Sequence, residues 1–136
     1  MISISGAPIT LDALEDVVYN GTQVSLEAAA TERMAASRQV IERIVATDET
    51  VYGVNTGFGK LSYVRIPNEE LGELQLNLVR SHSCGVGDPL SEPEVRAMLL
   101  LRANVLAVGL SGARPVVAET LIEMLNKGVL HVIPSR

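Results

Sequence analysis

The chain has 136 residues, which is about the length of one domain, and 47% of them are hydrophobic, enough for a packed core. Aromatic residues make up only 3% and Trp is absent, so aliphatic and methionine side chains must form that core. Eleven basic residues against sixteen acidic ones give a net charge of −5 without a basic block, which argues against a nucleic-acid partner.

A single cysteine excludes an internal disulfide and any multi-cysteine metal site, and the two histidines are not at metal-ligand spacing. The N-terminus has neither the basic region nor the apolar run of a signal peptide. No segment approaches the roughly 20 apolar residues of a membrane span. We therefore expect a cytoplasmic protein that binds no metal, no nucleic acid and no membrane.

Two short alternating segments, residues 2–4 and 22–26, are typical of strands and could pair as an edge ribbon near the N-terminus. Between them, the pattern predicts a short helix over about 10–18. Asn20-Gly21 supplies the left-handed stop of this helix.

Two longer helices are predicted for the middle of the chain. The first has Ser25 as its N-cap, an apolar face at helical spacing, and an end near Thr47-Asp48. The second begins at Pro67, because proline and early acidic residues are typical of a first helical turn. Gly85-Val-Gly87 breaks it. The segment 61–66 has no clear pattern.

A further helix opens with the capping box Ser91-Glu-Pro-Glu94, which is the clearest local signal in the chain. Apolar residues occupy almost every side of this helix, so we expect it to be buried on most faces. Arg102 and Asn104 lie among these apolar residues and need partners on another helix or another subunit.

A last helix is predicted from about Pro115 to Lys127, with Gly128 as the residue that ends it. The chain has no internal repeat and no low-complexity segment. The expected fold is therefore mainly α, with a short β ribbon near the N-terminus. Residues 1–136 are expected to form one helical segment without an internal linker.

The segment Tyr52-Gly-Val-Asn-Thr-Gly-Phe-Gly59 separates two of the predicted helices. Its three glycines permit backbone conformations that fit neither a helix nor a regular strand, so we expect a loop of fixed shape. Asn55 and Thr56 are expected to serve the turns of this loop. Spacing alone leaves two interpretations open: a linker between helices, or a loop that presents Tyr52 to a pocket.

His82 shares one helical face with three leucines, at positions 71, 74 and 78. The position suits either a core histidine or a pocket residue directed toward the Tyr52 loop, with Ser81 and the following glycines giving a ligand close access. Cys84 is expected to be a small buried packing residue and not a nucleophile, since no base is adjacent.

Taken together, four motifs resemble the aromatic amino acid ammonia-lyase family. The resemblance covers nearly the whole chain, and the loop motif is highly specific. They are Tyr52-Gly-Val-Asn-Thr-Gly-Phe-Gly59, Leu74-Gln-x-Asn-Leu78 running into Ser81-His82-x-x-Gly-Val-Gly87, Arg102-Ala-Asn-x-Leu106 and Gly109-x-Ser-Gly112. The Ser81-His82 pair resembles the branch that acts on L-histidine. Members acting on tyrosine tend to show His-Leu at these positions, and those acting on phenylalanine Phe-Leu.

This resemblance implies a largely helical homotetramer that converts L-histidine to trans-urocanate and ammonia, with active sites built from several subunits. It also implies a methylidene-imidazolone electrophile, which the family forms from an internal Ala-Ser-Gly. Tyr52 matches the family tyrosine proposed as the base for the substrate β-proton, and His82 matches the residue that contacts the substrate imidazole, with Ser81 beside it. A strong, desolvated tyrosinate suits that weakly acidic proton, and a polar imidazole partner selects histidine over phenylalanine.

Family members continue after Ile133-Pro-Ser with a glycine-rich run that contains Ala-Ser-Gly, whereas this chain stops at Arg136. We therefore expect an N-terminal fragment that is inactive alone and that self-associates through exposed apolar surface. Two alternatives remain open. One is a fragment of a tyrosine-type ammonia-lyase or aminomutase, and the other is a non-catalytic helical interaction module.

Overall fold

The computed structural model describes residues 1–47 and 49–136. The predicted helix end at Asp48 therefore lies outside the described residues. The expected mainly α fold with a short β ribbon is confirmed, since the described chain contains five α-helices and two short strands. None of the helices in this part of the chain is long and apolar enough to cross a membrane.

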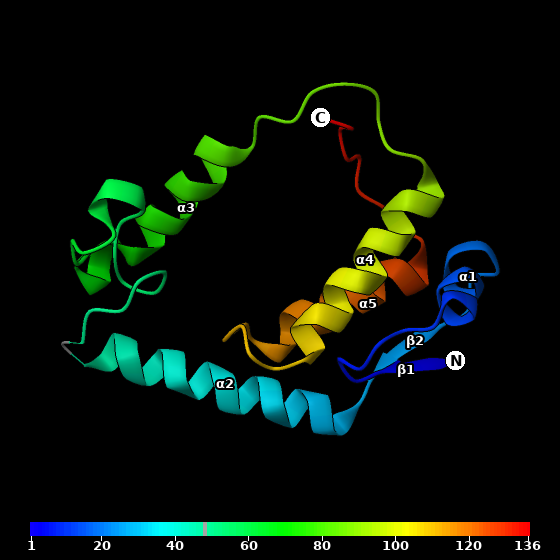
Figure 1. Ribbon diagram of the computed structural model, residues 1–136, viewed down its shortest axis with the longest axis horizontal. Coiled ribbons are helices and arrows are strands. Elements are labelled where there is room, and N and C mark those ends of the chain that lie inside the picture. The colour runs from blue at the N-terminus through cyan, green and yellow to red at the C-terminus, as the bar shows by residue number, and fades with distance from the viewer. Residues whose placement is uncertain (48) are drawn as a thin grey trace. The chain divides into compact units, whose positions relative to one another are not determined.

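The chain forms two compact units. The first contains residues 1–38 and 86–136, and the second contains residues 39–85. Helix α2 (Ala28–Ala46) runs through the boundary between the two units (Figure 1). The organisation of residues 1–136 as one segment without a linker stays a prediction.

The β ribbon lies in the first unit. Strand β1 (Ile2–Ile4) pairs with β2 (Val24–Leu26), as the alternating pattern predicted, and the two strands are parallel. Parallel neighbours need a crossover connection, and α1 (Leu11–Tyr19) provides it. This helix ends as predicted, with Gly21 at a φ of +66° just beyond its C-cap.

Helix α2 begins two residues later than predicted, at Ala28. Ser25 lies in β2, paired with Ser3, so the prediction that it caps the helix is wrong. The first helical hydrogen bonds instead go to the Glu27 carbonyl, which accepts the Thr31 N–H at 3.1 Å. Pairing with a distant strand therefore overrides a local capping preference.

Helices α4 (Glu92–Ala107) and α5 (Pro115–Lys127) pack side by side in the first unit (Figure 1), and both have the predicted boundaries. Gly128 ends α5 with a φ of +66°, as expected of a left-handed stop. Aliphatic side chains from the ribbon and three helices form the core, as the composition predicted. They are Ile4, Val17, Val24, Val95, Leu99, Leu100, Ala103, Ile122 and Leu125.

The predicted capping box is present at the start of α4. The Glu94 carboxylate accepts hydrogen bonds from the Ser91 hydroxyl at 2.6 Å and from the Ser91 N–H at 2.8 Å. These two bonds hold the pKa of Glu94 below its ordinary value, and the bond from the Ser91 hydroxyl contributes more than the bond from the N–H. The sequence predicted this capping box correctly because Ser91 and Glu94 lie within one helical turn of each other.

Only one side of α4 is buried by the described residues. Leu99, Leu100 and Ala103 lie in the core, whereas Leu101 is 46% exposed and Val105 is 58% exposed. The prediction that α4 is buried on most faces is therefore wrong for this chain by itself.

Arg96, on the buried side of α4, is a charged core residue that the sequence pattern did not explain. Its side chain is 9% exposed, and its guanidinium donates hydrogen bonds to the carbonyl oxygens of Val17 and Val18, at 2.7–3.3 Å. These carbonyls belong to the last turn of α1, where backbone acceptors lack helical partners and the helix dipole is negative. Arg96 therefore ties α1 to α4.

Arg96→Ala should lower the free energy of unfolding by about 3 kcal/mol, because it leaves buried carbonyls unpaired and creates a cavity. Urea unfolding followed by circular dichroism measures this change. The matched control is Arg102→Ala on the exposed side of the same helix, which should change stability by less than about 0.5 kcal/mol. Equal losses in the two variants would contradict the capping role of Arg96.

The second unit is organised around the loop between α2 and α3 (Leu71–His82). Two short 3-10 turns, η1 (Gly59–Leu61) and η2 (Asn68–Glu70), lie within that connection. Among the described residues of this unit, only three are buried: Asn55, Thr56 and Gly57. The unit is thus held together mainly by polar contacts of its loop and not by a large apolar core.

Candidate functional site

The loop that carries Tyr52 has a fixed shape, as predicted, and Asn55 is at its centre. The Asn55 side chain is fully buried, accepts the Val51 N–H at 2.8 Å, and donates to the Glu49 carbonyl at 2.8 Å. Its own carbonyl accepts the Ile66 N–H at 2.9 Å. One residue therefore joins both sides of the loop, which confirms the predicted turn role of Asn55.

Two glycines of the loop are required by its geometry. Gly53 has a φ of +77°, a conformation that side chains other than glycine rarely adopt. A Cβ atom at Gly57 would lie 2.7 Å from the Leu61 Cβ, so the backbone there approaches its neighbour too closely for any side chain. Glycine at these two positions therefore follows from the shape of the loop.

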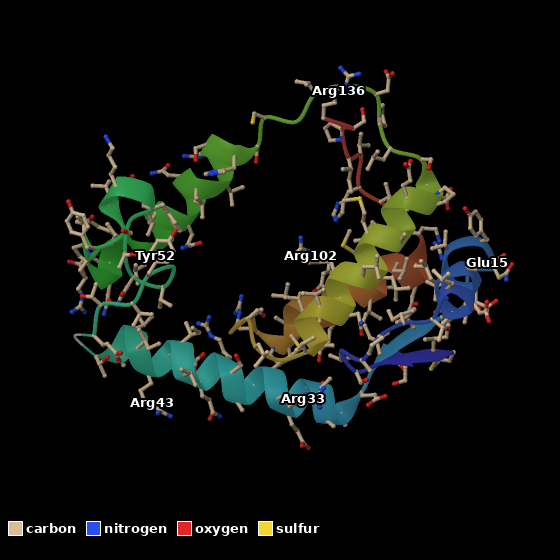
Figure 2. All side chains as sticks on the ribbon, in the orientation of Figure 1. Glu15, Arg33, Arg43, Tyr52, Arg102 and Arg136 are labelled. Atoms are coloured by element: carbon tan, nitrogen blue, oxygen red, sulfur yellow. The ribbon has the colours of Figure 1, made fainter. Side chains whose placement is uncertain are left out.

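Tyr52 lies at the surface of this rigid loop (Figure 2). Its side chain is 63% exposed, and its ring meets the Phe58 ring edge-on, with ring centroids 6.2 Å apart. An edge-to-face contact of this kind orients the tyrosine ring. Hydrogen bonds of Asn55 thus hold the loop backbone, while the Tyr52 side chain remains exposed.

Two residues that follow the loop motif bind the C-terminal end of α2, and the sequence pattern did not reveal these bonds. Arg65 donates to the Thr47 carbonyl at 3.0 Å, and Asn68 donates to the Val45 carbonyl at 2.9 Å. Both carbonyls are at the C-terminal end of α2, where helical partners are missing. Neither residue carries a sequence signal, because their partners lie about 20 residues away.

The predicted pair Ser81 and His82 ends α3 in the same unit as Tyr52. The His82 Nδ1 lies 2.9 Å from the Leu78 carbonyl oxygen and 3.0 Å from the Ser81 hydroxyl. A carbonyl oxygen only accepts, so the hydrogen-bond network assigns the proton of the neutral ring to Nδ1. The Nε2 atom is then left as a hydrogen-bond acceptor for a ligand.

His82 is exposed, so the interpretation of this residue as a core histidine is wrong. Cys84 is also exposed, and the prediction that it is buried is wrong as well. His82 is the last residue of α3 and Cys84 follows it, and no residue of this helix is buried by the described part of the chain. In the described structure, His82 and Tyr52 form no hydrogen bond with each other.

The two polar residues of α4 have different surroundings. Asn104 finds its predicted partners within the chain, since it accepts the Gly6 N–H at 3.0 Å and donates to the Ala7 carbonyl at 2.9 Å. Arg102 is exposed and forms no hydrogen bond or ion pair with the residues that the structure describes. Leu101 and Val105 of the same helix are exposed as well.

The chemical groups of this site are a phenol, an imidazole and a hydroxyl. No group of three or more potential metal ligands occurs among the described residues. The 136-residue sequence also contains no Ala-Ser-Gly tripeptide; the one similar segment, Ser111-Gly-Ala113, has the order reversed. These residues can therefore bind a polar ligand and exchange protons with it.

The chain thus combines a tyrosine on a glycine-rich loop with a helix that ends in Ser-His, on a mainly α scaffold. The model of the aromatic amino acid lyase family matches residues 9–136. The chain belongs to this family, and the resemblance seen in its motifs is confirmed.

Individual relatives point to histidine and tyrosine enzymes. The chain is 53% identical over 135 residues to the histidine ammonia-lyase of Koribacter versatilis (strain Ellin345), covering 99% of this chain and 26% of that protein. The crystal structure of tyrosine aminomutase from Streptomyces globisporus matches with a TM-score of 0.91 at 38% identity, covering 98% of this chain and 25% of the other. Histidine ammonia-lyase from Trypanosoma cruzi matches with a TM-score of 0.82 at 40% identity, over 92% and 24% of the two chains.

The chain thus spans about a quarter of the length of the curated relatives that it matches. Its motifs for the tyrosine loop and the Ser-His pair fall within that quarter.

Proposed function

We propose that this chain is the N-terminal part of a histidine ammonia-lyase, which eliminates ammonia from L-histidine to give trans-urocanate. The observation that carries the proposal is the 53% identity with the Koribacter versatilis enzyme across 99% of the chain. The Ser81-His82 pair supports it, because a histidine at this position offers the substrate imidazole a polar partner.

In this proposal each site residue has a distinct role. Tyr52 is the base that removes the β-proton of the substrate, and its exposed hydroxyl on a rigid loop supports that role. His82 contacts the substrate imidazole through Nε2, the acceptor left when Nδ1 is bound to the Leu78 carbonyl. Ser81 supports the binding position of His82 through its hydroxyl.

The electrophile is proposed to be a methylidene-imidazolone, formed by an Ala-Ser-Gly outside these 136 residues, and it supplies the activation that makes the β-proton removable. None of the residues described here can form that group, because the tripeptide is absent from them. The desolvation that a tyrosinate base requires must also come from further protein, since Tyr52 is 63% exposed.

We also propose that the longer protein is a cytoplasmic homotetramer. The exposed apolar side of α4 supports this, because residues such as Leu101 and Val105 are too apolar to face water over a whole helix side. Contact with other subunits of the same protein would cover them.

The direct test uses the full-length protein, meaning the longest chain that the gene encodes. Purified full-length protein given L-histidine should form urocanate, followed by its ultraviolet absorbance, whereas residues 1–136 alone should form none. A full-length protein without this activity would contradict the proposal. Activity of the 136-residue chain by itself would overturn the assignment of the electrophile to residues outside it.

A tyrosine-type ammonia-lyase or aminomutase is the second candidate, favoured by the TM-score of 0.91 with the Streptomyces globisporus enzyme. The double exchange Ser81→His with His82→Leu in the full-length protein separates the two. We expect activity on L-histidine to fall at least about 100-fold, because the imidazole loses its hydrogen-bond partner, and activity on L-tyrosine to rise.

The matched control for this exchange is Ser83→Ala. Ser83 is also at the end of α3, and its hydroxyl donates only to the Val79 carbonyl of its own helix, at 2.7 Å. This variant should keep the preference for histidine. An unchanged substrate preference after the double exchange would contradict the assignment of Ser81 and His82.

A non-catalytic helical module is a third candidate, and the coding sequence itself tests it. A reading frame that continues after Arg136 into an Ala-Ser-Gly supports the enzyme. A stop codon at that point supports the module. The rigid loop around Tyr52 favours the enzyme, because an interaction module has no physical need for a tyrosine framed by glycines.

A further inference from the structure

Among the described residues of the second unit, Asn55 is the most completely buried polar side chain, with none of its surface exposed. Its amide uses both of its ends: Oδ1 accepts the Val51 N–H and Nδ2 donates to the Glu49 carbonyl, each at 2.8 Å. Both partners belong to the backbone that leads directly into Tyr52. Buried amides with two good hydrogen bonds hold their partners in one arrangement.

Two backbone hydrogen bonds also link the residues on either side of Tyr52. The Asn55 N–H donates to the Val51 carbonyl at 3.2 Å, and the Val54 N–H donates to the same carbonyl at 3.1 Å. Together with the side-chain bond to the Val51 N–H, they close a tight turn whose first inner residue is Tyr52. The side chain of residue 55 is therefore bonded directly to the backbone that leads into Tyr52.

We propose that Asn55 is the positioning residue of Tyr52: it never touches the substrate, and it sets the place of the phenol hydroxyl. The catalytic consequence rests on the proposed role of Tyr52 as a base. A base must reach its proton within hydrogen-bond distance, and a displacement of about 1 Å can cost about 100-fold in rate.

The site demands an amide, since one end must accept and the other must donate. Alanine provides neither group and leaves the Val51 N–H and the Glu49 carbonyl unpaired inside the loop. An aspartate has the same shape and keeps the acceptor, but its ionised form cannot donate to Glu49. A protonated aspartate recovers a donor, so the Asn55→Asp variant should be restored by acid.

The test compares Asn55→Ala and Asn55→Asp in the full-length protein with the control Asn68→Ala. Asn68 also donates a side-chain bond to a backbone carbonyl of the same unit, that of Val45, and it does not contact the Tyr52 turn. We expect both Asn55 variants to lower kcat on L-histidine about 100-fold at pH 8 with a change in KM of less than about threefold. The Asn68 variant should change kcat less than about threefold.

For Asn55→Asp, the ratio of its kcat to that of the wild type should rise as the pH falls, because protonation restores the donor. Asn55→Ala should show no such rise. A merely structural role would lower the yield of folded protein without giving this pH dependence. A kcat within threefold of wild type in the folded aspartate variant would overturn the proposal.

A second measurement does not depend on lyase activity. Full-length protein labelled with 3-fluorotyrosine gives a fluorine resonance for Tyr52, which Tyr52→Phe identifies by its loss. Both Asn55 variants should shift or broaden this resonance, and Asn68→Ala should not. An unmoved resonance overturns the positioning role even if the protein proves to have another substrate, whereas a moved resonance without activity on histidine contradicts only the proposed function.

Discussion

Tyr52→Phe should lower kcat of the full-length protein on L-histidine by at least about 100-fold, the range expected when a general base is removed. The change deletes only the hydroxyl. The ring contact with Phe58, at 6.2 Å between centroids, and the hydrogen bonds of the loop backbone can all remain. KM should change little, because in the proposed site His82 and Ser81 bind the substrate. Steady-state kinetics by urocanate absorbance measure both constants.

The control for this variant is Tyr63→Phe. Tyr63 lies in the same unit and is 79% exposed, but it lies outside the tight turn that Asn55 closes. It should keep kcat within about threefold of the wild type, as surface substitutions usually do. A Tyr52→Phe variant as active as Tyr63→Phe would remove Tyr52 from the catalytic role and leave it as a packing residue.

Gly6→Ala should lower the free energy of unfolding of the first unit by about 4 kcal/mol. Gly6 has a φ of +87°, and an added Cβ would lie 2.6 Å from the Val108 backbone nitrogen. This overlap cannot be relieved by a side-chain movement, because the atom that the Cβ would meet belongs to the backbone at the end of α4. The Gly6 N–H is also bound to the Asn104 side chain at 3.0 Å, which keeps the loop in place.

Gly21→Ala separates the two causes of this loss. Gly21 has a similar φ, +66°, but a Cβ atom there meets nothing within 4 Å. It should therefore cost only the backbone strain, about 1 kcal/mol. Urea unfolding of both variants gives the difference, which measures the close approach of the loop to α4. A loss at Gly6 no larger than that at Gly21 would contradict this close approach.

The sequence predicted the residues of the candidate site but not their surroundings. Tyr52 and the pair Ser81-His82 were recognised through their motifs, and the glycines of the loop indicated a fixed shape. The exposure of His82 and Cys84 was not predictable, because helical spacing shows which residues share a face but not whether anything covers that face. The bonds of Arg65 and Asn68 to the end of α2 were missed because their partners lie 18 and 23 residues away in the chain.

The sequence by itself determined the helices whose ends carry local signals. The capping box at Ser91 and the left-handed glycines Gly21 and Gly128 predicted the boundaries of α1, α4 and α5, because each signal and its partner lie within about one turn.

Only the tertiary structure decided the features that depend on distant partners. Ser25 joined a strand instead of capping a helix, and Arg96 found carbonyls 78 and 79 residues away in α1. Asn104 found its partner 98 residues away at Gly6. Such bonds have no sequence spacing of their own, since chain folding alone brings the partners together. The Tyr52 loop shows both kinds of feature. Its glycines predicted a loop of fixed shape, whereas the burial of the Asn55 side chain became known only from the structure.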